Sequence, residues 1–207
     1  MTQSATIEGM HKLAKLKQTV AVLYEAQDPG RNDWADWLYD QHLPFVARKS
    51  RELAKQFGAH IELAEAAAWL HDVADVKMKR KHEGHEQASL DLARELMQKV
   101  GFTEEEIAIV VDDAIRLHSC YDGIKPKSLE GQVLATADAL AHLTTDFYLY
   151  TTRVLHQEMT LEQTKSWVLA KAQRDFEHKL CFDEIKQATR PDYEAIKNLF
   201  SRPPVTK

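Results

Sequence analysis

Stretches rich in helix-forming residues fill most of the chain, and no run alternates apolar and polar residues as a half-buried β-strand does. Between Ile107 and Ile115, for example, the apolar residues recur at the three- and four-residue spacing of a helix. Only seven glycines and six prolines punctuate the sequence. The pattern therefore predicts an all-α fold, a compact bundle of many helices.

The predicted helix boundaries follow from turn and capping signals. The first helix is expected over about 6–26, ending at Asp28-Pro29-Gly30. The second begins at Trp34, and Pro44 bends or restarts it. Further helices are predicted over about 61–72, 84–100, 103–118, 128–155, 160–180 and 183–200, and Thr103 through Glu106 form a capping-box signature.

The length and composition fit one domain. A chain of 207 residues with 44% apolar residues can bury one substantial core, so we expect a single domain over residues 1–207. Only the tail at Arg202-Pro203-Pro204 is predicted to lack regular structure.

Two aspartates stand where a buried apolar helix should not hold a charge. The alanine-rich segment 64–70 runs directly into His71-Asp72, and Asp138 lies among the small apolar residues 135–141. A metal cation would compensate both carboxylates, and histidine beside aspartate supplies a nitrogen and oxygen ligand set. For Asp138 alone, capping of a neighbouring helix or pairing with an arginine is an equally plain interpretation.

With His42 one helix upstream, these residues form the order H, HD, D, and the chain resembles the HD superfamily of metal-dependent phosphohydrolases. The resemblance is carried by His42, by Leu70-His71-Asp72 and by the segment 136–140 around Asp138. It implies that His42, His71, Asp72 and Asp138 bind a divalent transition metal (Mn, Fe, Co, Ni or Zn rather than Mg), with one ion favoured over two.

The resemblance extends over about residues 34–145 and points to the small bacterial HD hydrolases. In that branch the metal helix often reads DAD, whereas this chain has Thr136 in place of the first aspartate. An N-terminal helix within 1–33 and a helical extension over 146–207 lie outside the recognised core. We expect these flanks to pack on the core, to shape the substrate pocket or to form a homodimer surface.

Three further residues extend the predicted site. The resemblance places His85 and His118 at positions that supply extra ligands in two-metal relatives, and the helical spacing of 107–118 turns His118 inward. For both histidines the alternative is a hydrogen bond that supports a metal ligand, and for His118 also a contact with substrate phosphate. Asp75 follows Asp72 by three residues and is our candidate general base, with a helix-end cap as the alternative.

The basic stretch that follows the HD motif is a candidate phosphate-binding segment. Lys77, Lys79 and Arg80 are the residues predicted to bind substrate phosphates, because a phosphoanion needs fixed positive charge besides the metal. Weaker candidates are Arg48, Lys49, Lys125 and Lys127. We predict surface positions for His60 and His82, and no role for His11, His142, His156 and His178.

Charge and cysteine content exclude several protein classes. A net charge of -5 provides no basic footprint and argues against dedicated nucleic-acid binding. Cys120 and Cys181 lack CxxC spacing and are expected to be reduced thiols. The N-terminus lacks an apolar export core, and no later run approaches membrane-span length, so we expect a cytoplasmic protein without a membrane partner.

The predicted activity is hydrolysis of a phosphate ester or phosphoanhydride, with water activated by the metal and Asp75 as proton acceptor. A small phosphorylated substrate, a nucleotide by family resemblance, is the expected partner. Two alternatives stay open: a di-iron HD-type oxygenase, which occupancy of His85 and His118 would favour, and a non-catalytic, metal-stabilised sensor or interaction module.

Overall fold

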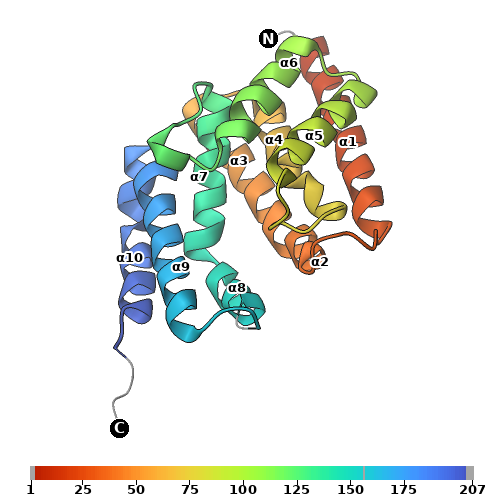
Figure 1. Cartoon of the computed structure of the whole chain (residues 1–207). Helices are drawn as coiled ribbons and strands as arrows, with labels where there is room; N and C mark the ends of the chain where they lie inside the picture. Colours follow the sequence, from red (N-terminus) through yellow and green to blue (C-terminus); the bar gives the residue numbers. More distant parts are fainter. Residues whose placement is uncertain (1–2, 156, 204–207) are drawn as a thin grey trace.

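A computed structural model describes residues 3–155 and 157–203 of the chain (Figure 1). These residues form helices and contain no β-strand, which confirms the predicted all-α fold. The α-helices are α1 (Gln3–Glu25), α2 (Ala35–Trp37), α3 (Leu43–Phe57), α4 (Ile61–Leu70), α5 (His85–Val100), α6 (Glu104–Ile107), α7 (Leu129–Thr144), α8 (Phe147–Leu155), α9 (Leu161–Arg174) and α10 (Asp183–Phe200). Short π-helical and 3₁₀ segments join several of them: η1 (Leu38–His42), η2 (Val73–Val76), η3 (Ala108–Ile115), η4 (Tyr121–Gly123) and η5 (Asp175–Lys179).

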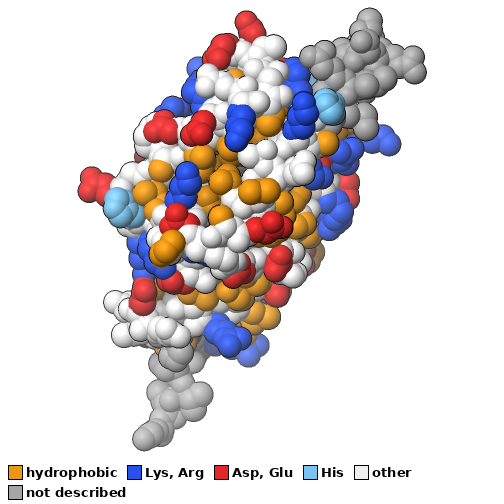
Figure 2. Space-filling view, turned by 90° about the vertical axis from the view of Figure 1, so that its right-hand side faces the viewer, with side chains coloured by type: hydrophobic (Ala, Val, Ile, Leu, Met, Phe, Trp, Pro, Cys, Tyr) orange, Lys and Arg blue, Asp and Glu red, His pale blue; other side chains and the backbone are white. Residues whose placement is uncertain are grey.

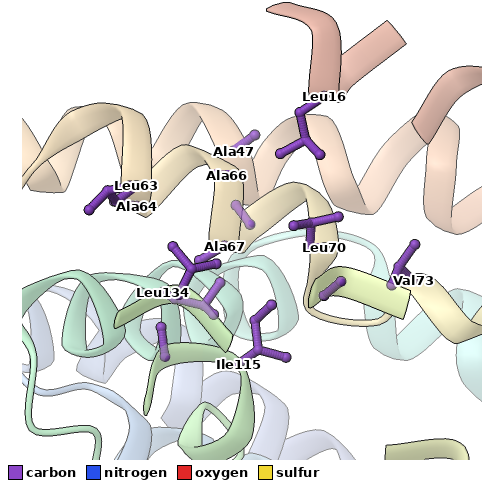
Figure 3. Close-up of a cluster of buried hydrophobic side chains, with 14 of the residues drawn as sticks. Leu16, Ala47, Leu63, Ala64, Ala66, Ala67, Leu70, Val73, Ile115 and Leu134 are labelled. Atoms are coloured by element: carbon purple, nitrogen blue, oxygen red, sulfur yellow. The ribbon is translucent and has the colours of Figure 1, made fainter. Parts of the chain in front are cut away.

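Helix α4 lies at the centre of the larger hydrophobic core and packs against α1, α3 and α7. Figure 3 shows Leu16 of α1 on one side of α4, and Leu134 of α7 and Ile115 on the other. The alanines of α4 let these neighbours approach closely, because a methyl side chain keeps two helix backbones near each other. This packing fixes the position of His71, the residue that follows α4.

Helix α7 packs closely against η3, and Gly131 permits the approach. A Cβ atom at Gly131 would lie 2.4 Å from Pro126 Cβ and 3.0 Å from Ala114 Cα. Any side chain at this position would therefore push α7 away from η3 and displace Asp138 further along the same helix.

The predicted helix over 128–155 is wrong, because the chain breaks at Thr145. This residue has an extended backbone, with φ −122° and ψ −171°. Its hydroxyl donates to Ala141 O and accepts from the backbone N–H of Phe147, so the side chain replaces helical hydrogen bonds. α7 therefore ends at Thr144, and α8 starts a new direction at Phe147.

Other boundaries agree more closely with the sequence. The capping box is confirmed, since Thr103 Oγ1 accepts from the Glu106 N–H and the Glu106 carboxylate accepts from the Thr103 N–H. Pro44 occupies the first turn of α3, where a proline is tolerated. The predicted helix over 160–180 changes at Asp175 from α-helix to the π-helical turn η5.

Helices α8, α9 and α10 form a second hydrophobic cluster with the C-terminal part of α7. In Figure 1, α9 and α10 lie side by side on the side of α7 opposite to α1. Leu140 and Ile185 pack against both clusters and join them. The surface in Figure 2 shows apolar side chains interspersed with acidic and basic ones. Among the described helices, none is both long and apolar enough to cross a membrane.

Candidate metal centre

His42 ends the π-helical turn η1, which rotates its ring into the protein immediately before α3 begins. The side chain is buried, with 4% exposure. Burial lowers its pKa although the adjacent Asp138 carboxylate opposes this, so the ring is held neutral and its nitrogen is suited to bind a cation. His42 Nε2 lies 3.1 Å from Asp138 Oδ1 and 3.3 Å from His71 Nε2.

His71 and Asp72 occupy the turn that leaves the buried end of α4. The His71 Nδ1–H donates to the carbonyl of Ala68 at 2.8 Å, which directs Nε2 toward the site. That nitrogen lies 3.4 Å from Asp72 Oδ2. Burial opposes ionisation of Asp72, but Arg80 and His71 outweigh it and hold the pKa of this carboxyl well below its usual range.

Asp138 and His142 are one turn apart on α7 and face the same space. His142 Nδ1 donates to Asp175 Oδ2 at 3.0 Å, and His142 Nε2 lies 3.2 Å from Asp138 Oδ1. Burial lowers the pKa of His142 to about 3. A neutral ring that donates from Nδ1 has only a lone pair at Nε2, so this lone pair faces the Asp138 carboxylate directly.

The Asp138 carboxylate is satisfied on one side only. Lys179 donates to Oδ2. Oδ1 is buried and accepts no hydrogen bond, although the Nε2 atoms of His42, His71 and His142 lie 3.1, 3.7 and 3.2 Å from it. Lone pairs of opposing acceptors repel one another unless a cation lies between them. The residues present therefore fit a metal ion.

Among the described residues, His42, Asp138 and His142 form the group whose ligand atoms all lie within 4.8 Å of one another. His71 and Asp72 adjoin this group through the contacts given above. His85 and His118 are not part of it. The structure thus brings the four residues of the HD motif together and adds His142.

His118 is anchored in the same way as His71 but faces the adjoining cavity. Its Nδ1 donates to Ile115 O at 2.6 Å, and its Nε2 lies 3.4 Å from Ser119 Oγ. The rings of His71 and His118 meet edge to face at 5.3 Å. Burial lowers the pKa of His118 to about 4. The inward orientation predicted from the helical spacing is therefore observed.

Asp75 lies in the 3₁₀ turn η2 and is fully buried. Its Oδ1 accepts hydrogen bonds from Asn32 Nδ2 and His85 Nε2, both at 3.0 Å. Arg80 donates to Oδ2 and also to Asp72. Arg80 therefore joins the two aspartates, and His85 separates Asp75 from the cavity.

A cavity of about 850 Å³ extends from the candidate metal centre between the HD residues and α9. His71, Asp72, Asp138 and His142 line its inner end. In the part of the chain that the structure describes, neither Asp75 nor Lys77 lines it. His85 and His118 do line the cavity.

The predicted phosphate-binding segment has a different arrangement from the one expected. Lys77 is exposed and does not line the cavity, and Lys79 lines the cavity but pairs with Asp33. Arg80 lines the cavity with its charge directed to Asp72 and Asp75. Arg48 and Lys49 pair with Glu52 on the surface of α3. Outside this segment, Lys125 and Lys127 are exposed and do not line the described cavity.

Sequence reasoning missed His142, Asp175 and Lys179. His142 could have been found from its position four residues after Asp138, which places both side chains on one face of α7. Asp175 is fully buried and accepts hydrogen bonds from His142 and from Tyr148 OH at 3.1 Å. Lys179, with 1% exposure, follows one turn later in η5.

A family model described as HD domain matches residues 39–143, slightly more than half of the 207 residues. No curated protein shows significant similarity to the chain. Among solved structures, the chain is similar to a predicted HD superfamily hydrolase from an uncultured Thermotogales bacterium. The identity is 20%, the TM-score is 0.56, and the match covers 88% of this chain and 87% of that chain, a likeness of fold alone. The family match confirms the resemblance predicted from the H, HD and D motifs, and the chain belongs to the HD domain family.

Proposed function

We propose that the protein is a metal-dependent phosphohydrolase that acts on a small phosphorylated substrate, with a nucleotide as the class that the family resemblance suggests. The observation that carries this proposal is Asp138 Oδ1, a buried carboxylate oxygen that accepts no hydrogen bond among three imidazole nitrogens. Membership of the HD domain family and the adjoining cavity support it.

The proposed ligands of one divalent ion are His42, His71, Asp72 and Asp138, with His142 as an additional ligand. Mixed imidazole and carboxylate donors favour Mn, Fe, Co, Ni or Zn over Mg. When bound, such an ion would acidify a coordinated water and stabilise charge on phosphoryl oxygens. Lys179 neutralises the outer oxygen of Asp138, and Asp175 fixes the tautomer of His142.

Asp75 and His85 are the proposed proton-transfer pair. The Asp75 carboxylate accepts the His85 Nε2–H, which leaves Nδ1 as the proton acceptor of a ring that lines the cavity. In this proposal the base predicted from the sequence acts through His85, and Asp75 stabilises the imidazolium that forms. Arg80 holds Asp75 and Asp72 at a fixed separation.

The test is phosphate and pyrophosphate release from a panel of nucleotides and phosphomonoesters, with metal-stripped protein reloaded separately with each ion. We expect release that requires the ion and is lost, together with bound metal, in Asp72→Ala. Asp75→Asn and His85→Gln should retain metal and lose about 100-fold or more in turnover. Exposed His178→Ala is the control.

The outcomes separate the competing functions. Unchanged turnover in Asp75→Asn would remove the proton-transfer assignment but not the hydrolase. Silence across the panel with one ion tightly bound would favour the metal-stabilised sensor. Stoichiometric binding of two irons, with oxygen consumption in place of phosphate release, would favour the oxygenase.

A further inference from the structure

Seven lysine and arginine side chains line the cavity within the described part of the chain, and six of them lie within ion-pair distance of a carboxylate. The paired cations are Lys79, Arg80, Lys81, Arg116, Lys171 and Lys179. The seventh is Arg174, which lies three residues after Lys171 at the end of α9 and on the same face of it. The least neutralised positive charge of the cavity therefore lies on the C-terminal extension, opposite the loop that follows the HD motif.

Arg174 has no carboxylate partner among the described residues. Its guanidinium lies over the ring of Tyr121, 4.6 Å from the ring centre, which supports the group and leaves its edges able to donate. Its Nε is buried and has no hydrogen-bond acceptor. A buried N–H without a partner is unfavourable, and the planar guanidinium matches the oxygen spacing of a phosphoryl group.

Lys171 has one weak ion pair, at 3.6 Å from Asp175 Oδ2, and no hydrogen bond among the described residues. Asp175 is already engaged, because His142 and Tyr148 donate to the same oxygen and Lys179 lies 3.7 Å from the other. The Lys171 side chain is only 14% exposed. An anion in the cavity would give this ammonium the partner that Asp175 provides only in part.

Lys171 is close to the candidate metal centre, and Arg174 lines the same cavity. Lys171 contacts Asp175, Asp175 accepts from His142, and His142 faces Asp138. A group bound by Lys171 and Arg174 would therefore be adjacent to a phosphoryl group bound at the metal centre, within the same cavity.

We propose that Lys171 and Arg174 form a second anion subsite, which selects substrates with a phosphoryl group beyond the one that is cleaved. This inference rests on the proposed function and deepens it: the substrate class is a phosphoanhydride, such as a nucleoside diphosphate or triphosphate, in preference to a phosphomonoester. The C-terminal extension then determines specificity, while the HD residues supply the reaction centre.

The experiment compares two phosphonates that the protein does not hydrolyse. Methylenediphosphonate and methylphosphonate are titrated by calorimetry into the metal-loaded full chain and into Lys171→Gln and Arg174→Gln. We expect each variant to weaken methylenediphosphonate binding about tenfold and to change methylphosphonate binding less than about twofold. Lys165→Gln, on α9 outside the cavity lining, is the matched control and should bind as wild type.

The comparison of wild type with the variants is decisive, because a diphosphonate can also bind a metal ion through both phosphonate groups. A preference of the wild type for the diphosphonate alone would therefore not identify the subsite. Equal affinities for methylenediphosphonate in wild type, Lys171→Gln and Arg174→Gln would overturn the subsite while phosphate release from the substrate panel would preserve the proposed function. Failure of both phosphonates to bind the metal-loaded wild type, without phosphate release from any substrate, would overturn both. Thermal unfolding and metal content of each variant exclude misfolding or metal loss as the cause.

Discussion

Asp175→Asn is the substitution that tests most directly how the C-terminal extension acts on the candidate metal centre. Asp175 accepts the His142 Nδ1–H at 3.0 Å and thereby leaves Nε2 free to bind a cation. An asparagine oxygen can still accept this hydrogen bond, but the negative charge that polarises the ring is lost. Asp175→Ala removes the acceptor altogether, so His142 can adopt the other tautomer or rotate.

The magnitude follows from these contacts. Loss of a carboxylate behind a metal-binding histidine typically weakens metal affinity about 10- to 100-fold, which is about 1.4–2.7 kcal/mol. We expect Asp175→Asn at the lower end and Asp175→Ala at the upper end. The metal-free Asp175→Asn protein should also lose about 3 kcal/mol of unfolding free energy, because a buried ion pair is broken. The loss should not be larger, since Lys179 keeps its second partner Asp138.

The assay is chelator competition for zinc or manganese, combined with thermal unfolding of metal-free and metal-loaded protein. Metal affinity and fold stability are thus measured separately. Glu177→Gln is the control, because Glu177 lies in the same π-helical turn but is exposed and pairs with Lys186. Wild-type metal affinity in both folded Asp175 variants would refute the role assigned to His142.

Three further predictions concern the charge states of Lys171 and Cys181 and the removal of Lys179. Burial lowers the pKa of Lys171 to about 8, so its positive charge is lost as pH rises through about 8. The affinity for methylenediphosphonate should therefore fall between about pH 7 and 9. In Lys171→Arg this fall in affinity should be less steep. A hydrogen bond from Cys120 lowers the pKa of Cys181 to about 7, so mass mapping should show faster iodoacetamide labelling of Cys181 than of buried Cys120, increasing through about pH 7. Lys179→Met should lower the free energy of unfolding of the metal-free protein by about 3 kcal/mol. The metal-loaded protein should lose less, because the ion supplies positive charge beside Asp138. Equal losses of unfolding free energy in both forms would contradict this.

The residues of the HD motif could be identified from the sequence because each conflicts with its surroundings. Asp72 and Asp138 adjoin or interrupt helices built for burial, and an uncompensated carboxylate there is costly. The sequence shows such a conflict without any knowledge of tertiary contacts. The structure places these side chains together with His42 and His71, as the order H, HD, D predicts.

Features that depend on distant contacts could not be predicted in this way. The break at Thr145 results from a hydroxyl that replaces two backbone partners, and a threonine in a helical pattern gives no clear sign of it. Asp175 and Lys179 belong to a segment with ordinary helical composition. Their role emerges only because η5 packs against α7 and directs Lys179 toward Asp138 and Asp175 toward His142.

The phosphate-binding residues show why charge in a sequence is an incomplete guide to anion binding. The basic stretch after the HD motif is adjacent to the site, as predicted, yet Arg80 is bound by Asp72 and Asp75, and its positive charge stabilises the protein. Arg174 has no such partner among the described residues and therefore retains its capacity to bind a ligand. Whether a cation is available to bind a ligand depends on the carboxylates that surround it in the folded protein. A binding assay on Lys171 and Arg174 variants therefore tests whether incompletely paired cations bind the anion, independently of which reaction the protein catalyses.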